Sequence, residues 1–190
     1  MVVCTIFILL ISVIISGCNR EPAQEPARKL SADDVTRFLE EQYFEVSAEQ
    51  ASVEDFEYIL LNGNKERLSY NSGKVLLLNF WATWCYPCKK EMPDMQALMI
   101  EMKGEPFRIL AINYGEKSEK VTRFIEKYNY SFDVVLDTDK TISSRLMIKG
   151  LPTTVLIDKN GQVLGKLVGP AKWDKKAFLE FFKKLSQKQP

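Results

Sequence analysis

The chain has 190 residues, of which 46% are hydrophobic and 27% charged, and 26 basic and 25 acidic side chains leave a formal net charge of +1. This balance is typical of a globular protein with one core, and it provides no basic field that would bind nucleic acid. The chain has four cysteines and no histidine. The lack of histidine excludes acid–base chemistry that depends on that side chain, and it disfavours a copper chaperone.

Residues 1–17 are uncharged and almost wholly apolar. The apolar run is shorter than the ~20 residues that a membrane-spanning helix needs, and it is typical of a signal peptide. It ends in Ser16-Gly17-Cys18, which resembles a bacterial lipobox in which Cys18 becomes lipidated. Nothing before Arg20 is positively charged, so an uncleaved membrane anchor is the alternative. In either case we expect the rest of the chain to be tethered outside the cytoplasm.

Two segments separate this leader from the main domain. Residues 18–30 are rich in Pro, Glu, Gln and Ala, so we expect a flexible linker. Residues 31–52 are expected to add a helix, since Ser31 can cap it and acidic residues follow in its first turn. The apolar stripe of this helix consists of Val35, Phe38 and Leu39.

Residues 53–190 are expected to form a single α/β domain. The predicted elements, in order, are a hairpin at 56–61 and 66–70, a strand at 74–81, a helix after Cys88, a strand at 107–113, a helix capped by Ser118, a strand at 134–136, a short helix at 139–147, a hairpin at 153–158 and 162–168, and a helix from Asp174. This alternation predicts a mixed central sheet flanked by helices on both faces. The helix after Cys88 carries a stripe of methionines, which we expect to lie in the core.

Cys85 and Cys88 follow the apolar strand at 74–81 and stand at the start of the next helix. A helix N-terminus carries partial positive charge, which favours a thiolate at Cys85, and the thiolate is the nucleophilic form of cysteine. Cys88 lies one turn further along the same face and can close a disulfide onto Cys85. Pro87 fits the first turn, where its missing N–H is not needed. The position of the pair therefore predicts a redox-active disulfide.

A zinc site and a permanent structural disulfide are less favoured roles for the two cysteines. A structural zinc site needs four cysteine or histidine ligands, but Cys4 and Cys18 fall in the leader region. A permanent structural disulfide would close a very short loop and constrain the unfolded chain little. We therefore expect no metal and no cofactor beyond the redox-active disulfide itself.

The sequence around the cysteines resembles the thioredoxin active site. The stretch N-F-W-A-T-W-C-Y-P-C-K-K-E-M-P at 79–93 is similar to the ResA/TlpA branch of membrane-anchored, extracytoplasmic thiol-disulfide oxidoreductases. The stretch G-L-P-T-T at 150–154 resembles the cis-proline loop of that family. The resemblance extends from about residue 56 to residue 185 and implies a thioredoxin-like fold.

The resemblance also implies roles for the residues of both motifs. Cys85 would be the nucleophile and Cys88 the resolving thiol. A cis bond at Leu151-Pro152 would turn the backbone of Leu151 toward Cys85, where it could pair with an extended substrate chain. The expected substrate-binding residues are Trp84, Tyr86, Pro87, Leu151 and Pro152.

By this resemblance the protein would reduce disulfides in extracytoplasmic proteins. The expected substrate is the oxidised haem-attachment cysteine pair of apocytochrome c, and the expected electron source is a membrane thiol donor of the CcdA/DsbD type. We expect a monomer held at the membrane by its lipid. The Tyr86-Pro87 dipeptide favours reduction, since the strongly oxidising relatives carry a histidine there that stabilises the thiolate. An oxidase or isomerase with the same cysteines and a non-enzymatic thioredoxin-fold binding module are the alternatives.

The proton acceptor is predicted from two further positions. Thioredoxin-like cytosolic reductases have a buried aspartate at the position of Asn79, but asparagine cannot titrate. Glu91 continues the three-residue step of Cys85 and Cys88 along one helix face, and ResA-like proteins have a glutamate at this place. We therefore expect Glu91 to be catalytic. The alternative is a surface glutamate that pairs with a neighbouring lysine.

Overall fold

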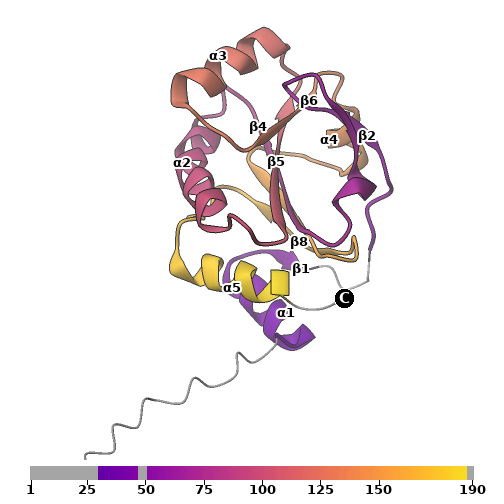
Figure 1. Cartoon of the computed structure of the whole chain (residues 1–190), viewed down its shortest axis with the longest axis vertical. Helices are drawn as coiled ribbons and strands as arrows, with labels where there is room; N and C mark the ends of the chain where they lie inside the picture. Colours follow the sequence, from indigo (N-terminus) through magenta and orange to yellow (C-terminus); the bar gives the residue numbers. More distant parts are fainter. Residues whose placement is uncertain (1–29, 47–50, 188–190) are drawn as a thin grey trace, which may run out of the picture.

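The computed structural model describes residues 30–46 and 51–187 (Figure 1). The expected signal peptide at 1–17, the linker up to residue 29 and the lipidation site Cys18 lie outside the described residues. Among the helices that are described, none has the length and apolar character required to cross a membrane.

The main sheet has the strand order β1-β8-β7-β4-β5-β6. Its strands are β1 (Glu45–Val46), β4 (Val75–Trp81), β5 (Phe107–Tyr114), β6 (Asp133–Asp137), β7 (Thr153–Ile157) and β8 (Val163–Val168). Strands β4, β5 and β6 are parallel, whereas β4 pairs antiparallel with β7, β7 with β8, and β8 with β1. The sheet is therefore mixed, as the sequence predicted.

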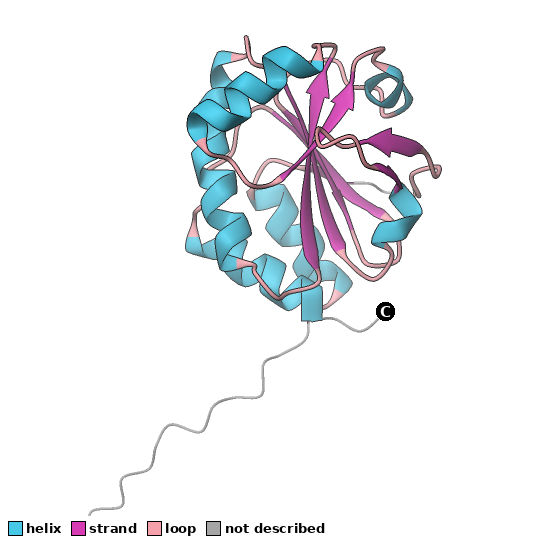
Figure 2. Ribbon diagram, turned by 45° about the horizontal axis from the view of Figure 1, so that its top comes forward, coloured by secondary structure: helices cyan, strands magenta, loops and turns pink. Residues whose placement is uncertain are grey.

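Helices and a small hairpin cover the two faces of this sheet. The helices are α1 (Ala32–Glu41), α2 (Tyr86–Glu101), α3 (Ser118–Tyr128), α4 (Thr141–Arg145) and α5 (Lys176–Gln187). Strand β4 is buried along its whole length, and its alternating side chains enter two cores. Leu77 and Trp81 belong to the core that includes residues of α1, α2, α3 and α5, whereas Leu78 and Phe80 belong to the core under the hairpin and α4. Figures 1 and 2 show the long helices gathered on one side of the sheet.

The hairpin consists of β2 (Glu57–Ile59) and β3 (Lys65–Arg67), followed by a 3-10 helix at Leu68–Asn71 where a continued strand was predicted. Its turn contains Asn62-Gly63, and Gly63 has a φ of 89°, a backbone conformation that glycine adopts readily in hairpin turns. Arg108 of β5 connects the hairpin to the main sheet. Its Nη1 donates to Glu66 Oε2 on β3 at 2.7 Å, and its Nε donates to Asp133 Oδ2 on β6 at 2.7 Å.

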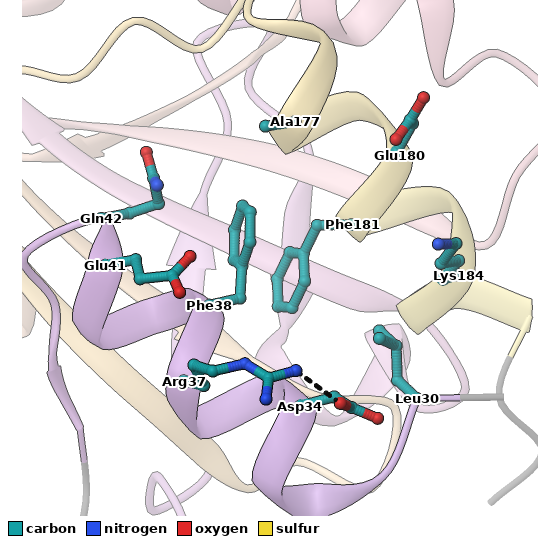
Figure 3. Close-up of a pocket in the computed structure, with 10 residues that line it drawn as sticks. All are labelled: Leu30, Asp34, Arg37, Phe38, Glu41, Gln42, Ala177, Glu180, Phe181 and Lys184. Carbon is teal, nitrogen blue, oxygen red and sulfur yellow. Dashed lines mark hydrogen bonds and ion pairs between the residues drawn. The ribbon is translucent and has the colours of Figure 1, made fainter. Parts of the chain in front are cut away.

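The described part of the added segment, residues 31–46, forms a helix and a short strand at the edge of the sheet. Ser31 caps α1 through a reciprocal capping box with Asp34. Phe38 of α1 stacks on Phe181 of α5 with ring centroids 4.1 Å apart (Figure 3). The chain then forms β1, which pairs with β8. This two-residue strand was not predicted, because its hydrogen bonds come from a partner far along the chain.

The predicted cap of α3 was wrong. Lys117 rather than Ser118 is its N-cap, so Ser118 already lies in the first helical turn. Tyr128, in the last turn of α3, is 48% exposed although it is a large aromatic residue. Its ring packs near the surface against Phe124 and Tyr130. The predicted methionine stripe of α2 does lie in the core, where Met92, Met95 and Met102 are buried.

Candidate active site

Cys85 and Cys88 form a disulfide where β4 leads into α2. Cys85 is the N-cap of α2, and its Sγ accepts a hydrogen bond from the N–H of Cys88 at 3.3 Å. A sulfur in this position faces the positive end of the helix, which favours a thiolate after reduction. Cys85 is 4% exposed and Cys88 0%, so Cys85 is the more accessible of the two.

The loop between β4 and Cys85 is held by Glu116, a residue that sequence reasoning missed. Glu116 accepts hydrogen bonds from the N–H of Thr83 at 2.7 Å, from the Thr83 hydroxyl at 2.6 Å and from Asn113 Nδ2 at 2.9 Å. Burial opposes ionisation of Glu116, but these hydrogen bonds and the one from Lys120 hold its pKa below the ordinary value. No sequence pattern links Glu116 to Thr83, because the two meet only through the pairing of β4 with β5.

Glu91 lies one turn beyond Cys88 on α2 and is 2% exposed. Its Oε1 accepts a hydrogen bond from Asn79 Nδ2 at 2.9 Å, and its Oε2 accepts from the N–H of Ala171 at 2.9 Å and from Trp173 Nε1 at 3.0 Å. Burial raises the pKa of Glu91 to about 7, although the three hydrogen bonds favour the carboxylate. Glu91 is therefore no surface residue paired with a lysine, and that alternative is wrong.

Asn79 joins three elements beside this carboxylate. It is fully buried on β4, and its Nδ2 donates both to Glu91 on α2 and to Thr154 Oγ1 on β7 at 3.0 Å. Its Oδ1 has no hydrogen-bond partner among the described residues. The position that holds a titrating aspartate in thioredoxin-like reductases therefore provides a neutral hydrogen-bond donor here.

The predicted cis-proline loop ends next to the same site. The Leu151-Pro152 peptide bond is cis, as expected. Thr153, the next residue, pairs with Phe80 on β4, so the loop lies at the end of β4 that leads to Cys85. The C=O of Pro152 accepts from the N–H of Gly169 at 2.9 Å, whereas the backbone groups of Leu151 have no hydrogen-bond partner in the described part of the chain. Leu151 can therefore pair with another chain.

The other predicted substrate-binding residues lie around the disulfide. Trp84 is 61% and Tyr86 66% exposed, which is unusual for large aromatic side chains. Pro87 is partly buried in the first turn of α2, as predicted. No cluster of metal-ligating side chains occurs in the described ranges. The site combines a disulfide, a buried carboxyl group and exposed aromatic rings.

Comparisons with known proteins identify a family and several relatives. The model of the AhpC/TSA family matches residues 50–165. Thiol-disulfide oxidoreductase ResA of Geobacillus thermodenitrificans is 40% identical over 130 residues, which cover 68% of this chain and 75% of that protein. ResA of Geobacillus kaustophilus is 42% identical over 115 residues, which cover 60% of this chain and 66% of that protein. ResA of Bacillus subtilis is 42% identical over 108 residues, which cover 57% of this chain and 60% of that protein. The chain thus spans between three fifths and three quarters of these relatives.

Solved structures show the same fold. A thioredoxin-family thiol:disulfide interchange protein from Chlorobium tepidum TLS superposes with a TM-score of 0.64 and 25% identity, covering 73% of this chain and 99% of that one. StoA from Bacillus subtilis superposes with a TM-score of 0.60 and 24% identity, covering 68% and 98%. The family model over residues 50–165 and the ResA relatives show that the chain belongs to the AhpC/TSA family and is a ResA-like member of the thioredoxin superfamily.

Proposed function

We propose that this chain is an extracytoplasmic thiol-disulfide oxidoreductase that reduces disulfide bonds in other proteins. The observation that carries the proposal is the Cys85–Cys88 disulfide at the N-terminus of α2, one turn from the buried carboxyl group of Glu91. The relatives named thiol-disulfide oxidoreductase ResA support the class of reaction.

The reaction proceeds by two exchange steps. In the reduced protein the Cys85 thiolate attacks one sulfur of a substrate disulfide, so that a Cys85–substrate bond forms and the other substrate sulfur leaves as a thiolate. Cys88 then loses its proton and attacks the Cys85 sulfur. The Cys85–Cys88 disulfide forms, the second substrate sulfur leaves, and two electrons have passed to the substrate. A thiol donor must then reduce the pair again.

Glu91 accepts the Cys88 proton in this scheme. A buried thiol resists ionisation, so a base nearby speeds its attack. A base works best when its pKa lies near the working pH, and burial raises the pKa of Glu91 to about 7. Asn79 cannot titrate, which leaves Glu91 as the acid–base group of the buried polar cluster that links α2, β4 and β7.

Leu151 and the exposed aromatic residues bind the substrate. The free backbone groups of Leu151 add an extended substrate segment beside the disulfide, while Trp84 and Tyr86 contact its side chains. The finer proposals, apocytochrome c as substrate and a CcdA/DsbD-type thiol donor, rest on the resemblance of the 79–93 motif to ResA/TlpA proteins. The proposed anchoring through Cys18 rests on the leader sequence alone.

The reduction potential of the Cys85–Cys88 couple tests the direction of electron flow. A value close to the roughly −270 mV of thioredoxin would support a reductase, whereas a value near the roughly −120 mV of DsbA would overturn it in favour of an oxidase. The reduced protein should also reduce a disulfide-bonded C-x-x-C-H peptide, the haem-attachment motif. A Cys85→Ser variant is the control and should be inactive. A protein without thiol exchange on any substrate would be a binding module.

A further inference from the structure

One segment supplies two of the three hydrogen bonds to Glu91. The connection between β8 and α5 provides both the N–H of Ala171 and the indole Nε1 of Trp173, and both donate to the same carboxylate oxygen at 2.9 and 3.0 Å. Trp173 is fully buried. Because Ala171 and Trp173 lie about eighty residues from Glu91 in the chain, this contact depends on how the connection is packed.

The indole ring of Trp173 is packed from two directions. Its centroid lies 5.0 Å from that of Phe178 on α5, and 6.5 Å from that of Phe44, which meets it edge to face at 77°. Phe44 is 5% exposed and belongs to the added N-terminal segment, between α1 and β1. A Cβ atom at Gly165 of β8 would lie 3.3 Å from Cδ1 of Phe44, so the segment is seated closely on the strand that leads to Trp173.

Hydrogen bonds from neutral N–H groups stabilise the charged form of Glu91. Within the described residues Glu91 has no ion-pair partner, and its carboxylate is met by the N–H groups of Asn79, Ala171 and Trp173. Asp94 of α2 raises the pKa of Glu91 through its charge, and it pairs with Lys172 of the β8–α5 connection at 3.4 Å. In the oxidised protein the two cysteines are joined in the disulfide and do not titrate. Loss of one N–H donor should therefore disturb Glu91 strongly.

We propose that Trp173 is a positioning residue that orients the Glu91 carboxyl group, and that the added segment at 31–46, through Phe44, holds Trp173 in place. The inference deepens the proposed function, because it rests on Glu91 as the proton acceptor. It also assigns a role to the N-terminal segment: α1 and β1 brace the acid–base group of the active site from outside the thioredoxin-like domain.

A Trp173→Phe variant tests the first part. Phenylalanine keeps a ring against Phe178 but lacks the N–H donor. Infrared titration of the oxidised protein follows the protonated carboxyl band of Glu91, which is assigned by its absence in Glu91→Gln. A hydrogen bond to a charged group is strong enough to move the midpoint up by about one to two pH units. An unchanged midpoint in Trp173→Phe would overturn the proposal.

A second measurement needs no substitution. In the ¹⁵N-labelled wild-type protein, the Trp173 indole N–H resonance should titrate with the same midpoint as the Glu91 band, because the proton donor senses the charge of its acceptor. An indole resonance that does not move with pH would contradict the contact. This measurement on the wild-type protein tests the hydrogen bond between Trp173 and Glu91 even if Trp173→Phe fails to fold.

Two matched variants test the N-terminal segment. Phe44→Leu removes the ring that meets Trp173, whereas Phe38→Leu removes a ring of the same segment that packs on Phe178 and Phe181 instead. We expect Phe44→Leu to raise the Glu91 midpoint by a few tenths of a unit or more, and Phe38→Leu, whose ring reaches Trp173 only through Phe178, to shift it less. Equal shifts in both variants, or no shift in Phe44→Leu, would refute the role of Phe44.

Kinetics separate this inference from the proposed function. If Glu91→Gln leaves the resolution of a mixed disulfide unchanged, the catalytic role of Glu91 fails, whatever the infrared data show. If Glu91→Gln slows resolution while Trp173→Phe changes neither its pH profile nor the infrared midpoint, only the positioning role of Trp173 fails.

Discussion

Replacing Glu91 by glutamine should remove a pH-dependent loss of stability from the oxidised protein. Burial raises the pKa of Glu91 from 4.5 to about 7. Between these values the unfolded chain has released the proton while the folded protein still binds it, so the free energy of unfolding falls as pH rises through this window. The loss is complete above pH 7. At 1.36 kcal/mol per pH unit over roughly two and a half units, it amounts to about 3 kcal/mol.

The structure indicates that glutamine fits the site. Its side-chain oxygen can accept from Ala171 and Trp173, and its NH₂ group would then face Asn79. A flip of the Asn79 amide would place Oδ1, which has no partner among the described residues, where it can accept from that NH₂ group. Thr154 can donate to the same oxygen through its hydroxyl. The flip would leave the buried Nδ2 of Asn79 where Oδ1 now lies, with no partner among the described residues, so the substitution removes the charge at a cost in stability that does not depend on pH.

Urea unfolding of both oxidised proteins between pH 4.5 and pH 8 measures the effect. The disulfide keeps the thiols from titrating, and acids with lowered pKa values, such as Glu66 and Glu116, affect both proteins alike. The stability of Glu91→Gln relative to wild type should rise by about 3 kcal/mol across this range. Parallel pH profiles would refute the reasoning. In the reduced protein, Glu91→Gln should also slow mixed-disulfide resolution by about 10²–10⁴-fold and lower the apparent pKa of Cys85.

Other perturbations test the remaining features of the molecule. Cys88→Ser should trap mixed disulfides with substrates through Cys85, whereas Cys85→Ser should trap few, because the N-cap sulfur is the more accessible one; non-reducing gels and mass spectrometry measure this, and equal trapping by both variants would contradict the order of attack. Glu116→Ala should lower the free energy of unfolding in urea by about 1–3 kcal/mol, since it leaves the N–H of Thr83 without its acceptor. An unchanged urea midpoint would show that the loop does not depend on this hydrogen bond. Arg108→Leu should cost a similar ~1–3 kcal/mol, because the partly buried Glu66 loses its cation, while disulfide reduction continues; loss of activity in a folded variant would contradict this separation. Cys18→Ser should release the protein from the membrane fraction or block its processing, and unchanged membrane association with an intact leader would favour a simple signal anchor.

The local features of the site were predictable because each depends on residues close together in the chain. The apolar strand, the cysteines at the following helix start and the three-residue step to Glu91 place three side chains on one helix face whatever the rest of the fold does. The two hairpins and the cis bond before Pro152 likewise follow from short stretches of sequence, the cis bond through the resemblance to a known loop.

What the tertiary structure alone decided is the environment of these residues. The sequence left Glu91 open between a catalytic base and a surface charge, because burial depends on what packs over a helix face. The groups that surround the Glu91 carboxyl group are Ala171 and Trp173 of the β8–α5 connection and Asn79 on β4. Glu116 and the strand β1 were missed for the same reason. Hydrophobic periodicity and helix capping depend on residues that are close together in the chain. The desolvation that raises the pKa of Glu91 instead arises from residues that only the sheet order and the packing of the helices bring together.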